Sequence, residues 1–470
     1  MRSQDGAVEV ACARGAAERC SPHRCVEASL IPVLFRHGWS VENTVPVRQS
    51  VRYPVITNSI DILGIQQDPP GDDFREPTVA WLDSHPPKER KERGQYMTPG
   101  LVRSRLLDKL TLEPGMRVLD PGVGTGEFLA DVRERESGTE LTGWDVDPVV
   151  LEIAGRNVPD AKLELRSALE APSADLFDLV IGNPPYFQFR ATPQMKKRFA
   201  PVISGRPNIF ALFFQVGIKL LAPGGTLAFV VPPSMNNGAY FEALREYILR
   251  ETAIVDLEVL SGNGLFTGAN TAVQLIVLRR GESSSDFTFS REQPESGFKR
   301  TVFSNRPQEL RDAFAGRVSV WEAGYEAVTG SIVWNQRRQA LRHFPEAGAH
   351  PLLWAKNIQG GELVLGSTDK RPQFVRAANP VEGPALVVNR IVGAVGKAGI
   401  RAALVPEGMR FFGENHVNVV RPRRGADQKV ALESLLAQLN DPEMASVVRL
   451  LTGNTQISAT ELTHLIPILS

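Results

Sequence analysis

Apolar residues follow a repeating helix and strand pattern between about residues 95 and 280. Short apolar runs of strand length stand at 116–119, 141–144, 162–165, 176–181, 226–231, 254–259 and 272–278. Between them, apolar residues recur every three or four positions, as is typical of amphipathic helices, most clearly over 209–220. This βαβα alternation predicts an α/β fold with a doubly wound, mostly parallel, Rossmann-like sheet.

The first helix of this region is expected to begin at a threonine and a proline. Thr98 suits an N-cap, and Pro99 suits the first helical position. Apolar residues then repeat at helical spacing as far as Leu110, before Pro114-Gly115 breaks the pattern.

The chain of 470 residues is long enough for about three domains. Residues 1–85 are rich in Pro, Gly and charge, and we expect a poorly ordered leader followed by a short arm or edge strand there. Residues 86–285 hold the alternating pattern and end in a Gly-Ser linker. The pattern becomes irregular over 286–470, where we expect a separate α+β domain.

Composition and charge narrow the class of protein. Hydrophobic residues make up 42% and charged residues 23%, as in ordinary globular enzymes. No run approaches the ~20 apolar residues that span a bilayer, and Glu9 and Arg14 interrupt any secretory signal, so we expect a cytoplasmic protein with no membrane partner. The formal net charge is +0, but basic residues outnumber acidic ones about two to one over 331–430.

The cysteines, Cys12, Cys20 and Cys25, all stand near the start of the chain. With His23 they match no usual zinc spacing, and we expect no metal site. Their position leaves no cysteine nucleophile in the remainder of the chain.

A glycine-rich turn, Asp120-Pro121-Gly122-Val123-Gly124-Thr125-Gly126, follows the first predicted strand and opens a helix. Such a turn lets backbone approach a ligand closely. The dinucleotide fingerprint G-x-G-x-x-G fails here, because Glu127 or Leu129 stands where its third glycine is required. A carboxylate in the first helical turn disfavours a pyrophosphate and is compatible with a ligand that carries an ammonium and a sulfonium. The turn therefore indicates S-adenosylmethionine (SAM).

An acidic residue ends the next predicted strand, as SAM binding requires. Asp145 stands at the position from which a carboxylate accepts hydrogen bonds from both ribose hydroxyls. Asp147 precedes Pro148, and we expect it to cap the following helix instead.

The fourth predicted strand ends in Asn183-Pro184-Pro185-Tyr186. The side-chain oxygen of Asn183 and the carbonyl of Pro184 are two acceptors in a stiffened segment, at the sheet edge where open α/β sheets bind ligands. Two fixed acceptors suit the two hydrogens of an amino group. Accepting both frees the nitrogen lone pair for methyl transfer without a metal or a strong base. Tyr186 is expected to supply a flat face for stacking.

In these motifs the chain resembles the amino-methylating DNA methyltransferases of type II restriction–modification systems, most of all their gamma class of adenine-N6 enzymes. The resemblance covers about 95–280 by motif, in the order Thr98-Pro99, glycine turn, Asn183 to Tyr186, and the C-terminal region more loosely. It implies that Thr98 contacts the cofactor and that Phe266 is a second stacking aromatic. Ser167 stands where the family often has an acid facing the SAM adenine.

The resemblance leaves the substrate partly open. The same Asn-Pro-Pro-Tyr motif occurs in enzymes that methylate protein glutamine, and close variants act on guanine in RNA. N4-cytosine in DNA is a further alternative, whereas C5-cytosine chemistry requires a cysteine nucleophile that this region lacks. A SAM-fold DNA-binding protein without turnover is the non-enzyme alternative.

The C-terminal region favours DNA. It combines a basic excess with Trp321, Trp334 and Trp354, and Ser458 to Glu461 fits a capping box near the end of the chain. We expect a monomeric adenine-N6 methyltransferase that flips its target out of double-stranded DNA. Its functional partner would be a separate restriction endonuclease.

Overall fold

The computed structural model describes residues 74–86, 89–90, 96–170, 176–205, 207–260, 272–283, 286–366, 370–391, 399–451 and 456–470. Phe266, the cysteines and His23 lie outside the described residues. None of the helices formed by the described residues has the length and apolar character needed to cross a lipid bilayer.

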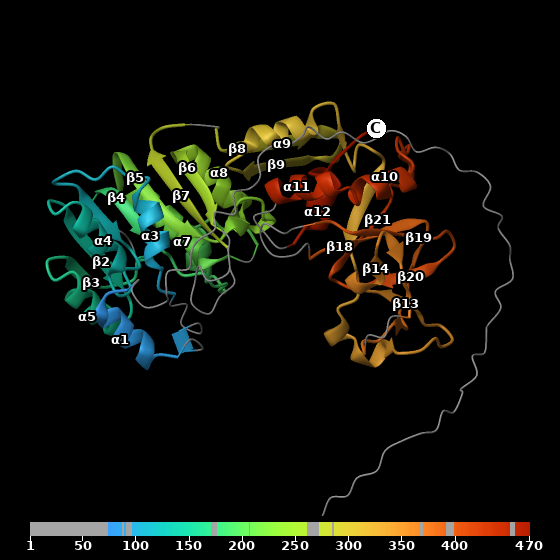
Figure 1. Cartoon of the computed structure of the whole chain (residues 1–470), viewed down its shortest axis with the longest axis horizontal. Coiled ribbons are helices and arrows are strands. Elements are labelled where there is room, and N and C mark those ends of the chain that lie inside the picture. Colours follow the sequence, from blue (N-terminus) through green and yellow to red (C-terminus); the bar gives the residue numbers. More distant parts are fainter. Residues whose placement is uncertain are drawn as a thin grey trace, which may run out of the picture. The chain divides into compact units, whose positions relative to one another are not determined.

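A seven-stranded sheet forms the centre of the structure between residues 117 and 280 (Figure 1). Its strand order is β3-β2-β1-β4-β5-β7-β6. Strand β7 runs in the opposite direction to the other six strands. The strands are β1 (Arg117–Asp120), β2 (Glu140–Asp145), β3 (Lys162–Leu165), β4 (Phe177–Gly182), β5 (Leu221–Val231), β6 (Thr252–Leu260) and β7 (Val273–Arg280). The predicted doubly wound, mostly parallel α/β sheet is confirmed.

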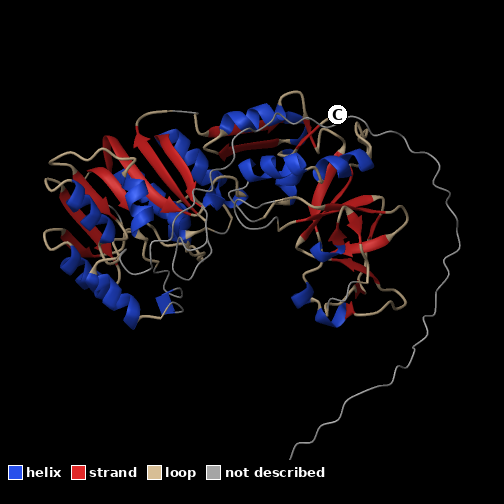
Figure 2. Ribbon diagram, viewed as in Figure 1, coloured by secondary structure: helices blue, strands red, loops and turns tan. Residues whose placement is uncertain are grey.

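Helices cover both faces of this sheet (Figure 2). They are α3 (Gly100–Leu107), α4 (Glu127–Arg135), α5 (Pro148–Asn157), α7 (Ile209–Leu220) and α8 (Glu242–Glu251). Helix α1 (Glu76–Ser84) packs on α5 instead, and α6 (Pro193–Arg198) has no buried residue. Successive strand residues point to opposite faces, so Val118 packs with α3, α4 and α5, and Leu119 packs with α7 and α8. The sheet is therefore buried on both sides, as a parallel sheet requires.

The C-terminal region contains several smaller sheets and a group of helices. The hairpin of β8 (Thr288–Gln293) and β9 (Phe298–Phe303) is followed by α9 (Pro307–Phe314). A four-stranded sheet comprises β11 (Tyr325–Thr329), β21 (Val417–Pro422), β18 (Ala385–Asn389) and β19 (Ala402–Val405). A five-stranded sheet comprises β12 (Leu341–Arg342), β16 (Phe374–Val375), β13 (His350–Leu353), β20 (Arg410–Gly413) and β17 (Val381–Glu382).

Short strand pairs and three helices complete this region. They are β10 (Val318–Ser319) with β22 (Pro467–Ile468), β14 (Ile358–Gln359) with β15 (Glu362–Leu363), and α10 (Leu432–Leu439), α11 (Pro442–Leu451) and α12 (Ala459–His464). The capping box at α12 has formed as predicted, because Ser458 and Glu461 each accept a hydrogen bond from the other's backbone N–H.

Three local predictions differ from the structure. Residues 76–84 form helix α1, where we expected a poorly ordered leader and a short arm or strand. Thr98 does not cap α3; Pro99 occupies the N-cap position, and no side chain bonds there. Strand β5 already begins at Leu221, whereas the apolar run predicted a strand only over 226–231.

Buried ion pairs explain why α1 is attached to the sheet domain. Arg75, just before α1, donates from its backbone nitrogen to Glu127 Oε1 (3.0 Å) and from Nη1 to Glu127 Oε2 (2.8 Å) and Asp131 Oδ1 (2.9 Å). Trp81 of α1 then packs against α5. This segment is rich in Pro, Gly and charged residues, yet it is ordered because Arg75 binds acidic side chains more than 50 positions away.

We predict that Arg75→Ala lowers the free energy of unfolding by about 1–2 kcal/mol, because the two side-chain hydrogen bonds to Glu127 and Asp131 are lost, while the backbone N–H bond to Glu127 is kept. Urea denaturation followed by circular dichroism measures this loss. Arg156→Ala is the control, because its ion pair with Glu152 is mostly exposed and should contribute little. Equal effects of the two substitutions would contradict the anchoring role of Arg75.

Candidate functional site

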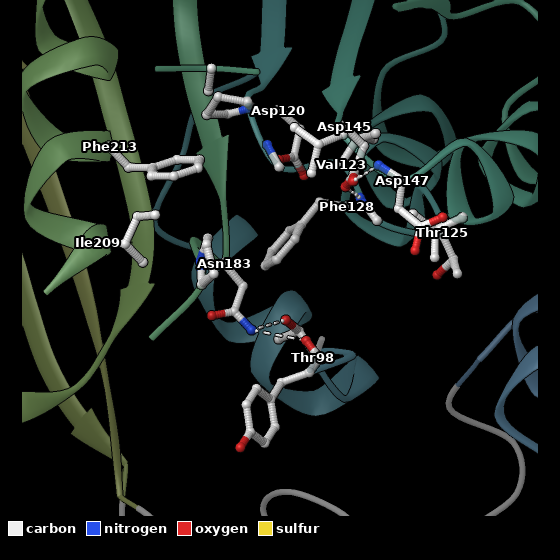
Figure 3. Close-up of a pocket in the computed structure, with 18 of the residues that line it drawn as sticks. Thr98, Asp120, Val123, Thr125, Phe128, Asp145, Asp147, Asn183, Ile209 and Phe213 are labelled. Carbon is white, nitrogen blue, oxygen red and sulfur yellow. Dashed lines mark hydrogen bonds between the residues drawn. The ribbon is translucent and has the colours of Figure 1, made fainter. Parts of the chain in front are cut away.

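A cavity of about 480 Å³ lies at the carboxyl ends of the parallel strands (Figure 3). Its walls come from the segments that follow β1, β2, β3 and β4, from the segment before α3, and from the first turns of α7. Seven of the predicted site residues line it: Thr98, Asp120, Gly122, Gly124, Asp145, Ser167 and Asn183. This position is where open parallel α/β sheets bind ligands.

The glycine turn adopts the backbone that its sequence suggests. Gly124 (φ +52°) and Gly126 (φ +83°) are left-handed, a conformation that other residues rarely adopt. Gly126 does not line the cavity; a Cβ there would lie 3.1 Å from Ala154, so this glycine allows α4 and α5 to approach. Gly122 and Gly124 line the cavity itself.

Asp145 is tied to the glycine turn by its carboxylate. Oδ2 accepts a hydrogen bond from Gly124 N, and Oδ1 accepts one from Asp147 N, both at 2.9 Å. Burial raises the pKa of Asp145 even though these N–H groups favour its ionised form. Asp147 caps α5 by accepting from Val149 N at 2.9 Å, as predicted.

Asp120 is the buried acid of the site, with 2% of its surface exposed. It accepts a hydrogen bond from Gly122 N at 3.0 Å. Burial raises the pKa of Asp120 to about 8, and the nearby Asp145 acts in the same direction. Strand β4 passes so close that a Cβ on Gly182 would lie 2.6 Å from Asp120 Oδ1. The site therefore holds a carboxyl that a cationic ligand would help to ionise.

Glu127 also lines the cavity, but its charge is already matched. Besides Arg75, its Oε2 lies 3.2 Å from Arg103 Nη2, and both Glu127 and Arg103 are buried. The sequence predicts a cationic ligand from this carboxylate. In the structure the Glu127 carboxylate instead pairs with Arg75 and Arg103 and so anchors α1 and α3. Asp120 is the acid better placed for a cation.

Asn183 follows β4 and has its amide nitrogen fixed. Nδ2 donates to Thr98 Oγ1 at 2.9 Å and to Tyr96 O at 3.3 Å. The carboxamide oxygen is thereby left on the other side, where the Tyr186 hydroxyl contacts it. Pro184 is buried, and no donor among the residues that the structure describes contacts its carbonyl oxygen. The two predicted acceptors are therefore both present in this segment.

The ring of Tyr186 is not presented to the cavity as a stacking surface. Its ring meets Phe210 edge-on, with centroids 6.2 Å apart, and its hydroxyl lies 2.7 Å from Val230 O. The ring is partly buried and does not line the cavity. Phe187, next in sequence, does line it and is 41% exposed. The stacking roles of Tyr186 and of Phe266 stay predictions.

Other cavity residues escaped sequence reasoning. Ile209 and Phe213 line the cavity from one face of α7, but their apolar spacing had been assigned entirely to the core. The two residues stand four positions apart and therefore share one face at the start of α7. This spacing, close to the Asn183-Pro184-Pro185-Tyr186 motif, is a signal that could have identified them. Ser167 lines the cavity as predicted, and its Oγ accepts from Leu169 N at 3.2 Å.

Comparison with known proteins gives this site a context. Residues 152–266 match the Eco57I restriction-modification methylase family. The Type II methyltransferase M.CvrRI of Paramecium bursaria Chlorella virus XZ-6E is 28% identical over 208 residues, which are 44% of this chain and 54% of that protein. The match therefore spans only about half of that relative's length.

Two further proteins show the range of similarity. The Type II methyltransferase M.BsuBI of Bacillus subtilis is 25% identical over 440 residues, covering 80% of this chain and 87% of that protein. A methyltransferase subunit of the type I restriction-modification system from Streptococcus thermophilus superimposes with a TM-score of 0.36 and 19% identity, covering 47% of this chain and 53% of the other. SAM is the cofactor of this class of methylase. The chain has the mostly parallel seven-stranded α/β sheet described above, and its central segment matches the Eco57I restriction-modification methylase family.

Proposed function

We propose that this chain is a site-specific DNA adenine-N6 methyltransferase that acts as a monomer and protects sites from a separate restriction endonuclease. The observation that carries the proposal is Asn183, whose amide nitrogen is held by Thr98 and Tyr96 so that its oxygen is available as an acceptor. The resemblance of the motifs and the names of the Type II relatives support the same reaction.

The cavity suits SAM at its cofactor end. Asp145 has lone pairs free for ribose hydroxyls beyond the two N–H groups that it already binds. Asp120 is a buried carboxyl whose ionisation a positive charge would favour. Phe213 and Phe128 supply apolar surface for a planar base. When bound, SAM supplies a methyl group on a positively charged sulfur.

The Asn183 segment suits an amino group at the substrate end. Asn183 Oδ1 and Pro184 O can each accept one hydrogen of an NH2 group, which draws the nitrogen toward a tetrahedral geometry and frees its lone pair. The Tyr186 hydroxyl already contacts Asn183 Oδ1, but a carboxamide oxygen has two lone pairs and accepts from both. These residues orient the nitrogen and require no general base.

A basic and aromatic surface in the C-terminal region supports DNA as the substrate. Trp334 is 39% exposed and lies beside exposed Arg337 and Arg338, with Arg338 Cζ 5.8 Å from the indole ring. Arginines neutralise phosphates and read guanine edges, and aromatic side chains contact bases. Trp354, in contrast, is buried.

The alternatives share the reaction and differ in the carrier of the amino group. N4-cytosine, a glutamine amide and an RNA base all present an NH2 group, so the acceptors alone do not distinguish them. The basic surface around Trp334 favours a nucleic acid over a protein, and the Type II relatives favour DNA. A binding protein without turnover has no need for an amide held in one orientation.

The proposal is tested by incubating the protein with methyl-labelled SAM and duplex DNA, RNA or protein, then digesting the product to identify the labelled residue. We expect label in N6-methyladenine at a defined DNA sequence. Label in N4-methylcytosine, in glutamine or in RNA would replace the substrate, and absence of label in all three would contradict the enzyme assignment.

Asn183→Ala should abolish transfer, lowering kcat by at least about 1000-fold, because the substrate amino group loses an acceptor. The dissociation constant of SAM, measured by calorimetry, should change little. Asn440→Ala, which removes a partly buried amide that bonds the backbone N–H and carbonyl of Ala402 far from the cavity, is the matched control and should retain activity. Full activity of the Asn183 variant would exclude the proposed mechanism.

The affinity for SAM should depend on pH through Asp120. Its pKa of about 8 means that most of the free protein carries a proton there at pH 7, and a cationic ligand favours the ionised form. Binding should therefore release a proton and tighten as pH rises from 6 to 8, by at most about tenfold per unit. Because the unfolded carboxyl ionises near 3.8, the ligand-free fold loses stability as pH rises from about 3.8 to about 8, and the loss is complete above that pH.

Calorimetry in two buffers of different ionisation enthalpy measures this proton release. Asp120→Asn should remove both the proton release and the pH dependence that Asp120 causes. Asp178→Asn, at the other end of β4, should keep both. An unchanged pH profile in Asp120→Asn would assign the effect to another group.

The double variant Arg337→Ala/Arg338→Ala should weaken DNA binding and reduce the slope of log K against log salt concentration by about 2, because two phosphate contacts are lost. SAM affinity should not change. Arg156→Ala/Arg250→Ala removes two exposed arginines from α5 and α8 and should leave the slope unaltered. Equal slopes for both double variants would place the DNA contact elsewhere.

A further inference from the structure

An asparagine can act as an acceptor only if its carboxamide is turned the right way. The oxygen and nitrogen ends are nearly equal in size, but only the oxygen can accept a hydrogen from an amino group. With the nitrogen end toward the substrate, Asn183 would present N–H groups to N–H groups. The reaction that we propose therefore depends on what fixes the orientation of this side chain.

Two groups before α3 hold the nitrogen end of Asn183. The Thr98 hydroxyl oxygen lies 2.9 Å from Nδ2, and the Tyr96 carbonyl lies 3.3 Å from it (Figure 3). The Tyr96 carbonyl can only accept, so the reversed amide would face it with an oxygen. The shorter contact is the one to Thr98, which is 5% exposed and shielded from water. Both amide hydrogens are thus matched, and the oxygen is directed away.

Thr98 is itself held from behind. Its carbonyl oxygen accepts a hydrogen bond from Arg103 Nη1 at 2.6 Å. Arg103 in turn contacts Asp131 Oδ2 through Nε at 2.6 Å and Glu127 through Nη2 at 3.2 Å. Both acids belong to α4, the helix that begins directly after the glycine turn. The backbone of Thr98 is therefore fixed to the element that shapes the cofactor end of the cavity.

We propose that Thr98 is a positioning residue: its hydroxyl accepts one hydrogen of the Asn183 amide nitrogen and, together with the acceptor-only Tyr96 carbonyl, holds the carboxamide so that Oδ1 faces the substrate amino group. The inference rests on the proposed function and assigns Thr98 a task distinct from the cofactor contact that the motif resemblance implies. It makes the segment before α3 part of the substrate end of the site.

The two roles of Thr98 predict different kinetics. Loss of a cofactor contact weakens SAM binding and raises KM for SAM, while kcat at saturation is kept. Loss of the amide anchor lowers kcat, because a smaller fraction of Asn183 side chains presents the oxygen, and SAM affinity is kept. Separating kcat from KM therefore separates the two assignments.

Thr98→Val is the informative substitution, because it keeps the shape of threonine and removes its hydroxyl. We expect kcat to fall about 10- to 100-fold. The dissociation constants for SAM and DNA should stay within about threefold of wild type. Thr98→Ser, which restores the hydroxyl, should recover most of kcat. Thr98→Ala offers a second test if the valine variant folds poorly, as judged by circular dichroism and melting temperature.

Thr139→Val is the matched control. Thr139 is similarly buried, at 4% exposed, and its hydroxyl donates to Glu136 O at 3.0 Å, before β2 and away from the cavity. It should lose stability without losing kcat. Wild-type kcat in Thr98→Val, or a loss of SAM affinity beyond threefold, would overturn the positioning role. A wild-type protein that methylates no DNA would instead overturn the proposed function.

Discussion

The whole site depends on one constraint, which is that parallel strands end at the same edge of a sheet. Asp120, Asp145 and Asn183 stand at or just after the ends of β1, β2 and β4, and these strands occupy neighbouring or next-neighbouring positions. Residues more than 60 positions apart in sequence thus line one cavity. The buried sheet is rigid because both faces are packed, so the acceptors at its edge can be held in place without a ligand.

A second layer of contacts fixes the segments that do not belong to the sheet. Arg75 and Arg103 approach Glu127 and Asp131 from two different segments and join both to α4. Each charge is buried or partly buried, so its cost in desolvation is offset only because all four side chains are paired. Through Arg103 the same group holds the Thr98 carbonyl. The cofactor turn and the Asn183 amide are therefore supported by one connected set of side chains.

The chain pattern predicted the parts of this arrangement that depend on local or periodic signals. The strands of the central sheet and the helix over 209–220 follow from apolar spacing, and Asp147 and Ser458 cap helices as their flanking residues indicate. Partners distant in sequence were not predictable. Arg75 orders α1 through Glu127, and Asn237 donates to Glu461 at 2.7 Å from 224 positions away. Thr98 was expected to cap a helix, but its hydroxyl instead meets Asn183, a pairing that only the fold creates.

In the proposed function, different groups of side chains bind the amino group, bind the cofactor and select the substrate. Two acceptors beside a cavity select an NH2 group, and an NH2 group is common to adenine, cytosine and a glutamine amide. In the function that we propose, the acidic groups at the other end of the cavity respond to the charge of the cofactor and not to the substrate. We therefore propose that surface outside the cavity contributes to selection of the target, where the exposed arginines beside Trp334 have the charge to contact a phosphate backbone. The reaction and the choice of substrate are thus separable properties, because they depend on different groups of side chains.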